Sequence, residues 1–205
     1  MVGFYYNPRD PSIFDDVQFY DQSYDPAGLG ISSRSWSFGD GASATGCCPK
    51  HRYAADGTYT LTLTVTTPDG RSATRSRDLL VRTHDVSVAA VLAPQTGVVG
   101  QSGTITVAVR NSRYPETVQV QLLKSVVGGG WQPVGVLMQH VPVRGETSTT
   151  VFDFDYPFAR EDAQLGKVSF RAVATIRGAR DAISSDNTSI SALVHVQRGK
   201  GRREA

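Results

Sequence analysis

The sequence predicts an all-β protein built from two tandem antiparallel β-sandwiches. Three observations support this class: apolar and polar residues alternate along several short segments, turn residues separate these segments, and we find no helical stripe. The chain has 205 residues, of which 40% are hydrophobic and 20% charged, as in ordinary globular proteins. Since an average domain has roughly 150 residues, this length allows one large domain or two small ones, and the strand pattern favours two.

The clearest alternation runs from Thr58 to Thr66, where odd positions are apolar or aromatic and even positions are Thr. Such a strand has one buried and one solvent-facing side, and the β-branched Thr side chain suits the pleated, exposed side. The same period recurs at 105–109, 118–122, 168–176 and 190–196, the last with Ile190, Ala192, Val194 and Val196 on the buried side. Turn clusters at 25–28, 39–41, 68–70 and 128–130 complete a pattern typical of a sandwich or barrel.

We place the domain boundary at residues 82–84, giving a first domain at 1–83 and a second at 84–196. An alternating run from Arg71 to Val81 closes the first, and Asp85 to Val88 opens the second with the same pattern. Each is long enough for a sandwich, which typically has about 100 residues. Residues 197–205 are basic and nearly free of apolar side chains, so we expect a disordered tail or a linker there.

Charge and hydropathy exclude two classes of protein. Lys and Arg number 21 and Asp and Glu 19, so the net charge is only +2, which excludes a dedicated nucleic-acid-binding protein. No run approaches the 18 apolar residues of a membrane-spanning helix, so we expect no direct membrane insertion. Arg9 and Asp10 interrupt the N-terminus where a secretory signal needs an apolar run. The chain is then a mature or excised segment, or its true start lies upstream, or the protein is not exported by a signal peptide.

The segment Trp36-Ser37-Phe38-Gly39-Asp40-Gly41 resembles the signature of PKD domains, small Ig-like β-sandwiches found mostly outside cells. Residues 17–25 resemble the early strand and turn of this family, and 51–53 and 57–65 resemble its later strands. The resemblance covers residues 4–81 and implies an Ig-like fold in an extracellular or cell-surface protein. Ser37 departs from the family, which most often has Asp at this position.

We interpret the motif as a device for folding. Trp36 and Phe38 are two positions apart and therefore share one face of a strand. The Gly-Asp-Gly sequence permits a tight turn with positive φ, in which Asp40 accepts backbone amides. For His51 we expect a structural hydrogen bond. The structural set comprises Trp36, Phe38, Gly39, Asp40, Gly41, His51, Tyr53, Gly57 and Tyr59.

The second domain resembles CARDB domains, which are Ig-like modules related to bacterial adhesion. The resemblance covers residues 84–196 and rests on 85–88, on 100–111, and on Asp186-Asn187 before a closing strand at 189–196. Another Ig-like or fibronectin-like family would have the same architecture, so the predicted fold does not depend on that name.

No catalytic motif accompanies these domains. The four histidines lack the spacing of a helical metal pair, and nucleophile-elbow, phosphate-loop and dinucleotide motifs are absent. We therefore expect a protein that is not an enzyme. The adjacent Cys47 and Cys48 lack the further Cys/His pair that a closed zinc site needs. They form a strained vicinal disulfide, two loop thiols or an intermolecular bridge.

We expect no cofactor, with calcium as the alternative. Asp21, Asp25 and Asp40 are the calcium candidates, because they are carboxylates in loops and calcium prefers oxygen ligands. For ligand contact the candidates are the aromatic residues Trp131, Tyr114 and Tyr156, since aromatic rings supply large contact areas. Trp131 is equally consistent with a core residue at the start of a strand.

These observations predict a non-catalytic, extracellular or cell-surface bacterial module that acts as a spacer and binds a protein or polysaccharide in adhesion. One alternative is an accessory substrate-binding segment of a secreted hydrolase. Another is a stand-alone structural protein, such as a phage decoration or fibre subunit. Exposed sheet edges also leave homo-association open.

Overall fold

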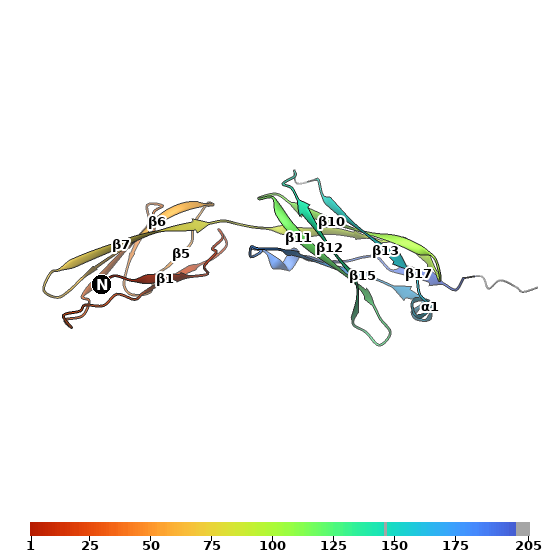
Figure 1. The fold of residues 1–205 in the computed structure, drawn as a ribbon, viewed down its shortest axis with the longest axis horizontal. Helices are drawn as coiled ribbons and strands as arrows, with labels where there is room; N and C mark the ends of the chain where they lie inside the picture. The colour runs from red at the N-terminus through yellow and green to blue at the C-terminus, as the bar shows by residue number, and fades with distance from the viewer. Residues whose placement is uncertain (146, 200–205) are drawn as a thin grey trace, which may run out of the picture. The chain divides into compact units, whose positions relative to one another are not determined.

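The chain forms two β-sandwiches, which Figure 1 shows in the computed structural model. Apolar and polar residues alternate along several of their strands. The structure describes residues 1–145 and 147–199. One unit ends at Thr83 and the other begins at His84. Apart from one parallel pair, the strands pair antiparallel, and this confirms the all-β fold of tandem antiparallel sandwiches.

The first unit has seven strands in two sheets. Its strands are β1 (Phe4–Asn7), β2 (Val17–Asp21), β3 (Ser33–Ser37), β4 (Ser43–Thr45), β5 (Lys50–His51), β6 (Gly57–Thr66) and β7 (Ser72–Val81). The sheets have the strand orders β1-β2-β5 and β4-β3-β6-β7. Three of the pairings join consecutive strands, whereas β2–β5 and β3–β6 join strands that are farther apart in the chain.

Trp36 lies at the centre of the core between these two sheets. It is fully buried, and its ring centroid lies 5.5 Å from that of Phe4 on β1 and 5.8 Å from that of Phe19 on β2. The indole Nε1 donates a hydrogen bond of 2.9 Å to the carbonyl of Gly46, which satisfies its one polar group. Trp36 thus packs one sheet against the other and anchors the loop after β4.

The β6–β7 pair shows why Thr occupies the even positions of β6. On the solvent side, Thr62 and Thr64 form 2.9 Å hydroxyl hydrogen bonds with Ser76 and Thr74 on β7. Strand β7 itself does not show the expected alternation, because its first seven residues are exposed and only Leu79 and Val81 are buried. It is the last strand of its sheet, and charged residues there oppose pairing with another chain.

In its described residues, 84–145 and 147–199, the second unit has three sheets and one short α-helix. Its elements are β8 (Val86–Leu92), β9 (Thr96–Val98), β10 (Ser102–Asn111), β11 (Glu116–Ser125), β12 (Trp131–Val141), β13 (Thr150–Pro157), α1 (Arg160–Leu165), β14 (Lys167–Val168), β15 (Phe170–Ile176), the 3₁₀ helix η1 (Ser184–Asp186), β16 (Thr188–Ile190) and β17 (Val194–Gln197). The sheet orders are β13-β10-β8, β12-β11-β15-β16 and β14-β17-β9. Inward side chains of the first two sheets, such as Val107, Val120 and Phe152, are fully buried between them.

The closing strand expected at 189–196 is instead two strands that belong to different sheets. Ile190 ends β16 and is 54% exposed, whereas Ser191 is buried, the reverse of the predicted alternation. Ser191 Oγ accepts a hydrogen bond from the Phe170 amide and donates one to the Ala192 carbonyl. This local side-chain bonding competes with a continuous ladder, and the chain changes sheets here, from β16 to β17.

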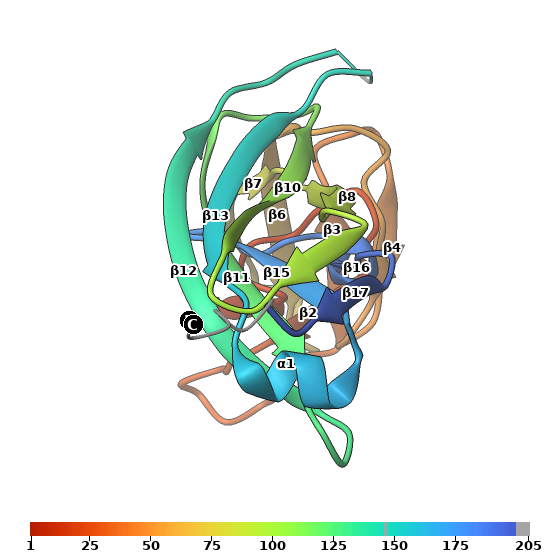
Figure 2. The ribbon, with the colours of Figure 1, turned by 90° about the vertical axis from the view of Figure 1, so that its right-hand side faces the viewer.

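The sequence did not predict the helix α1, which spans only six residues. Figure 2 shows it at one end of the second unit, where it contacts β14 and β17. Among the described residues, no helix is long and apolar enough to span a membrane. Gln197 of the expected tail belongs to β17, and residues 200–205 of that tail lie outside the described part of the chain.

The two glycines of the Trp36–Gly41 motif predict a graded loss of stability on substitution by Ala. Both have positive φ, at +86° for Gly39 and +96° for Gly41, but only at Gly39 would an added Cβ lie 2.7 Å from the Thr60 amide nitrogen. We expect Gly41→Ala to cost about 1–2 kcal/mol for its backbone conformation. Gly39→Ala should cost a further ~1–3 kcal/mol for overpacking.

Native-state hydrogen exchange of the β3 and β6 amides measures these losses within the first unit alone. Equal losses for the two variants would contradict the close backbone approach at Gly39.

Candidate functional site

Trp131 lies on the solvent-facing side of the second unit's four-stranded sheet. It is the first residue of β12, is half-buried, and is absent from the hydrophobic cores formed by the described residues. The guanidinium carbon of Arg171 on β15 lies 5.9 Å from its ring centroid, within the range of a cation–π contact. Of the two predicted interpretations, a surface aromatic agrees with this position better than a core residue does.

Further apolar side chains share this side of the sheet. Val136 and Met138 pair with Gln121 and Gln119, which alternate along β11 with the buried Val120, so both point away from the core. Ile190 pairs with Arg171. Val136, Met138 and Ile190 are 51%, 53% and 54% exposed. We call Trp131, Val136, Met138, Arg171 and Ile190 the β12 face. A sheet face that exposes several apolar side chains is typical of an interaction surface.

The other two predicted contact aromatics do not belong to the β12 face. Tyr156 is only 6% exposed, and its hydroxyl donates a 2.7 Å hydrogen bond to Asp162, so its assignment as a ligand contact was wrong. Alternation along β13 places it on the core side. Tyr114 precedes β11 and is half-buried against His84, with 5.2 Å between the ring centroids. Trp131 pairs with Ser125 at the other end of β11, so these two aromatics do not converge.

An ion pair between the partly buried Lys124 and the buried Asp162 attaches helix α1 to the core. Lys124 Nζ lies 2.8 Å from Asp162 Oδ1, and the Ala159 amide donates to Asp162 Oδ2 at 2.8 Å. Burial raises the pKa of Asp162, but the hydrogen bonds from Lys124 and Tyr156 outweigh it and hold the pKa below its usual value. The carboxylate is thus charged and fully paired, and its role is to hold the helix.

The three calcium candidates of the first unit each have a partner within the protein. Asp21 pairs with Arg34 at 2.5 Å, Asp25 with Arg71 at 3.0 Å, and Asp40 with His51 at 2.6 Å. In the described part of the chain, none of them belongs to a group of three metal-ligating side chains. The partners of these carboxylates are thus two arginine side chains and the His51 ring.

The residues of the structural motif pack around His51. The ring of His51 stacks on Phe38 at a centroid distance of 4.3 Å, and Tyr53 lies edge-on to it at 4.8 Å. The Tyr53 hydroxyl donates to the Phe38 carbonyl at 3.1 Å, and Tyr59 stacks on Tyr53, near Gly57. With its bond to Asp40, His51 has the structural hydrogen bond expected for it.

A group of carboxylates that the sequence did not indicate lies at one end of the second unit. Ligand oxygens of Asp85, Asp181 and Asp186 lie within 4.8 Å of one another. Asp181 accepts hydrogen bonds from the Val86 and Ile183 amides, whereas Asp85 Oδ1 is buried without a hydrogen-bond partner. Burial first, and then the nearby Asp186 and Asp181, raise the pKa of Asp85 to about 6. About 100 residues separate Asp85 from the other two, so no local motif reveals the group.

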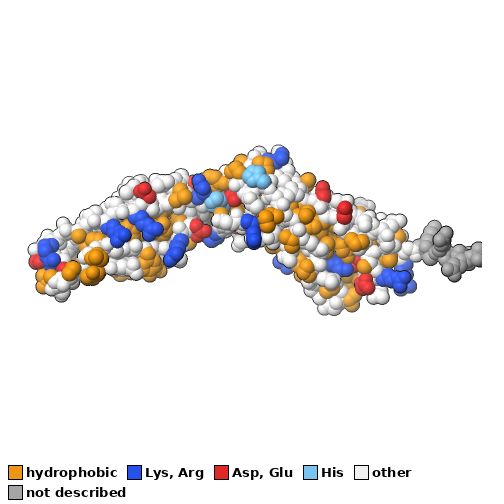
Figure 3. Space-filling model, in the orientation of Figure 1, with side chains coloured by type: hydrophobic (Ala, Val, Ile, Leu, Met, Phe, Trp, Pro, Cys, Tyr) orange, Lys and Arg blue, Asp and Glu red, His pale blue; other side chains and the backbone are white. Residues whose placement is uncertain are grey.

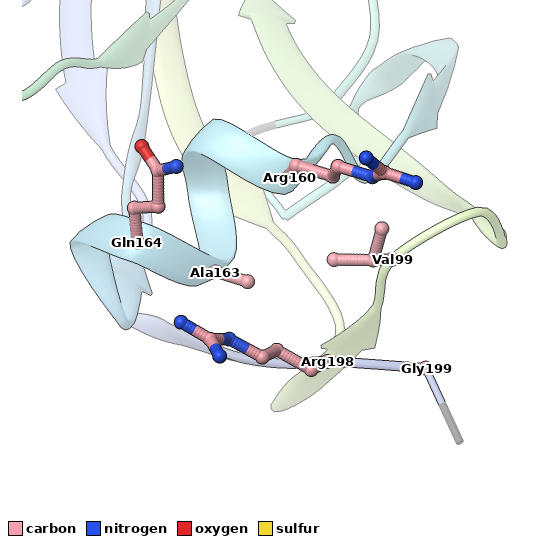
Figure 4. A pocket seen from close by; sticks show the side chains of 6 residues that line it. All are labelled: Val99, Arg160, Ala163, Gln164, Arg198 and Gly199. Carbon is pink, nitrogen blue, oxygen red and sulfur yellow. The ribbon is translucent and has the colours of Figure 1, made fainter. Parts of the chain in front are cut away.

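Two arginines flank a concave surface of about 400 Å³ beside α1. Arg160 extends over Val99, while Arg198 extends beneath Ala163 and Gln164 (Figure 4). On the face of the molecule drawn in Figure 3, basic and hydrophobic side chains are interspersed and form no single large patch. This concavity is shallow and polar, unlike the apolar clefts of most small-molecule sites.

The first unit also carries an aromatic pair that the sequence analysis missed. Tyr5 on β1 and Tyr20 on β2 pair across the strands, and their rings stack with 4.7 Å between centroids. Tyr5 is 44% exposed. Each tyrosine neighbours buried residues, Phe4 and Phe19, so strand alternation in 4–7 and 17–21 was the signal that could have revealed the pair.

Comparison with known proteins identifies the first unit. Residues 9–81 match the PKD domain family, which confirms the PKD resemblance for these residues. A microbial collagenase of Vibrio alginolyticus is 38% identical over 61 residues, which make up 30% of this chain and 7% of the collagenase. The chain thus spans a small part of that relative.

Two solved PKD1 domains also match this chain. The domain from the Vibrio cholerae metalloprotease PrtV is 32% identical, with 40% of this chain and 95% of that chain covered and a TM-score of 0.36. The domain of Vibrio anguillarum Epp is 28% identical, with 40% and 92% covered and a TM-score of 0.36. The CARDB resemblance of the second unit stays a prediction.

The raised pKa of Asp85 predicts how stability depends on pH. Between the ordinary pKa of 3.8 and about 6, the folded protein retains a proton that the unfolded chain releases, so stability falls as the pH rises through this window. Asp85→Asn stays neutral, and we expect it to lose less stability there and to melt at a higher temperature than the wild type at about pH 7.

Thermal unfolding from about pH 4 to 7 in the presence of a chelator measures this difference. Asp153→Asn, an exposed carboxylate on β13, is the matched control. If Asp85→Asn followed the wild-type pH profile, the loss of stability with rising pH would not be due to Asp85.

Proposed function

We propose that this chain, whose residues 9–81 form a PKD domain, is a non-catalytic binding and spacer segment of a larger, secreted bacterial protein. The observation that carries the proposal is the β12 face, on which Trp131 and exposed apolar side chains lie together on the outer side of a four-stranded sheet. Small-molecule sites are typically concave, so an open sheet face suits an extended ligand, such as a protein fibre or a polysaccharide, better than a small molecule.

The energetics of the β12 face favour binding through Trp131. Aromatic side chains bring a large contact area at low entropic cost and are frequent at the energetic centres of interfaces. Arg171 packs against the indole at 5.9 Å, and its Nε is buried without a hydrogen-bond partner among the described residues. The contact restrains the ring before any ligand arrives, which lowers the entropy lost on binding.

The spacer role rests on the PKD domain. Its core is closed by fully buried aromatic residues, including Trp36, Phe19 and Tyr53, so the domain holds its own shape. The collagenase relative is much longer than the matched segment, and in such a protein a PKD domain accompanies other domains. We extend this arrangement to the present chain and place it outside the cell.

Substitutions on the β12 face test the binding role. We expect Trp131→Ala to weaken retention of the full chain on insoluble collagen, chitin or cellulose by at least about tenfold, because buried interface Trp residues commonly contribute 2 kcal/mol or more. Met138→Ala should have a smaller effect in the same direction. Co-sedimentation at increasing protein concentration gives the apparent affinities.

Val151→Ala is the matched control, because Val151 is 48% exposed on β13, in the opposite sheet. Melting curves establish that each variant is folded. Undiminished retention of folded Trp131→Ala on every material that retains the wild type would refute the role of the β12 face.

A second candidate is the accessory segment of a secreted hydrolase. It is favoured by the names of the relatives, a collagenase and a metalloprotease. In that case the segment holds a catalytic domain near its polymeric substrate, and the same face would serve both functions. The two candidates differ in what adjoins the segment in the native protein.

Immunoblotting of fractionated native cells and culture medium distinguishes these cases. Both secreted candidates predict a species much larger than 22.1 kDa, and hydrolysis of the bound polymer by that purified species supports the hydrolase. A cytoplasmic or virion-bound species near 22.1 kDa would refute secretion and favour a stand-alone structural protein.

A further inference from the structure

Cys47 and Cys48 lie side by side in the connection between β4 and β5, and both side chains are exposed free thiols. Their sulfur atoms are 2.9 Å apart. A disulfide bond has a sulfur–sulfur distance of about 2.0 Å, so only a small movement separates the two thiols from bond formation. A small thiol reagent in solution can reach either sulfur.

The backbone on both sides of this dipeptide is attached to the core of the PKD domain. The Gly46 carbonyl accepts from the buried indole of Trp36 at 2.9 Å, and the Asp21 amide donates to the Cys47 carbonyl at 3.2 Å. On the other side, the Phe19 amide donates to the Pro49 carbonyl at 3.0 Å. These contacts keep the two thiols together, so a reaction of one places the other at a high effective concentration.

We propose that Cys47 and Cys48 form a site of reversible oxidation, at which a small dialkyl disulfide converts the two thiols into a vicinal disulfide. Cys47, as thiolate, attacks one sulfur of the reagent, whose bond breaks and releases one thiolate that takes up a proton. Cys48 then loses its proton and attacks Cys47 Sγ, which expels the second reagent thiolate. In total, two protein thiols are oxidised by two electrons and one reagent disulfide is reduced to two thiols.

The order of these steps follows from the contact between the two cysteines. The hydrogen bond with Cys47 raises the pKa of Cys48, which disfavours the Cys48 thiolate as the first attacking group. Because the thiolate is the nucleophile in exchange, Cys48 acts as the resolving residue. The product is an eight-membered ring that strains its peptide, and strained disulfides are readily reduced, which makes the site reversible.

Mass spectrometry of the intact full chain tests the proposal. After reduced protein is incubated with oxidised glutathione, we expect the wild type to lose two hydrogen atoms in mass, to lose both free thiols and to retain no glutathione. Each single variant, Cys47→Ser or Cys48→Ser, should retain one glutathione, because it lacks a resolving thiol. Dithiothreitol should restore both thiols of the wild type.

Three results would overturn the proposal: wild-type protein that retains glutathione, protein that forms disulfide-linked dimers, or protein that keeps two unreacted thiols. Both cysteines are exposed, so we expect the serine variants to fold, and melting curves verify this. The amide resonances of Asp21 and Phe19 give a second readout, since their acceptors flank the dipeptide and should shift when the ring closes.

Discussion

The packing of alternate side chains between two facing sheets holds each unit together, and in the PKD domain it depends most directly on Trp36. Its indole contacts aromatic rings of the opposite sheet and binds the Gly46 carbonyl. Truncating a buried Trp or Phe costs about 3–5 kcal/mol, a large share of the 5–15 kcal/mol that stabilise a typical domain. The Gly39 turn follows Trp36 by three residues. The connection that contains Cys47 and Cys48 is attached to Trp36 through the Gly46 carbonyl.

The outward sides of the sheets do not contribute to the cores, and they carry different kinds of side chain. On the β6–β7 pair, hydroxyl side chains form hydrogen bonds with each other across the strands. These hydroxyl groups therefore have partners within the protein. On the β12 face, apolar side chains are exposed instead. Because a β-strand presents successive side chains to opposite sides, such a face can form without disturbing the core beneath it. This separation lets a stable sandwich carry the binding surface that we propose.

The buried carboxylate of Asp162 has a structural role. Asp162, Lys124 and Tyr156 bond to one another and attach the short helix α1, which is too short to be stable alone. Tyr156 was expected to contact a ligand because aromatic rings supply large contact areas. Its hydroxyl group found a buried partner on α1, an element that the sequence did not predict. Alternation along β13 places Tyr156 on the core side, but the partner of its hydroxyl group depends on α1.

The sequence by itself determined the all-β class, the PKD domain and the inward position of Trp36 and Phe38, because these depend on period-2 alternation and on turn residues close together in the chain. Only the tertiary structure decided the division of residues 188–197 between two sheets, since it follows from the hydrogen bonds of Ser191 with Phe170 and Ala192. The same holds for the partners of Asp21, Asp25 and Asp40 and for the meeting of Asp85 with Asp181 and Asp186. Contacts between residues distant in sequence depend on how strands pair and sheets pack, and no local pattern encodes them.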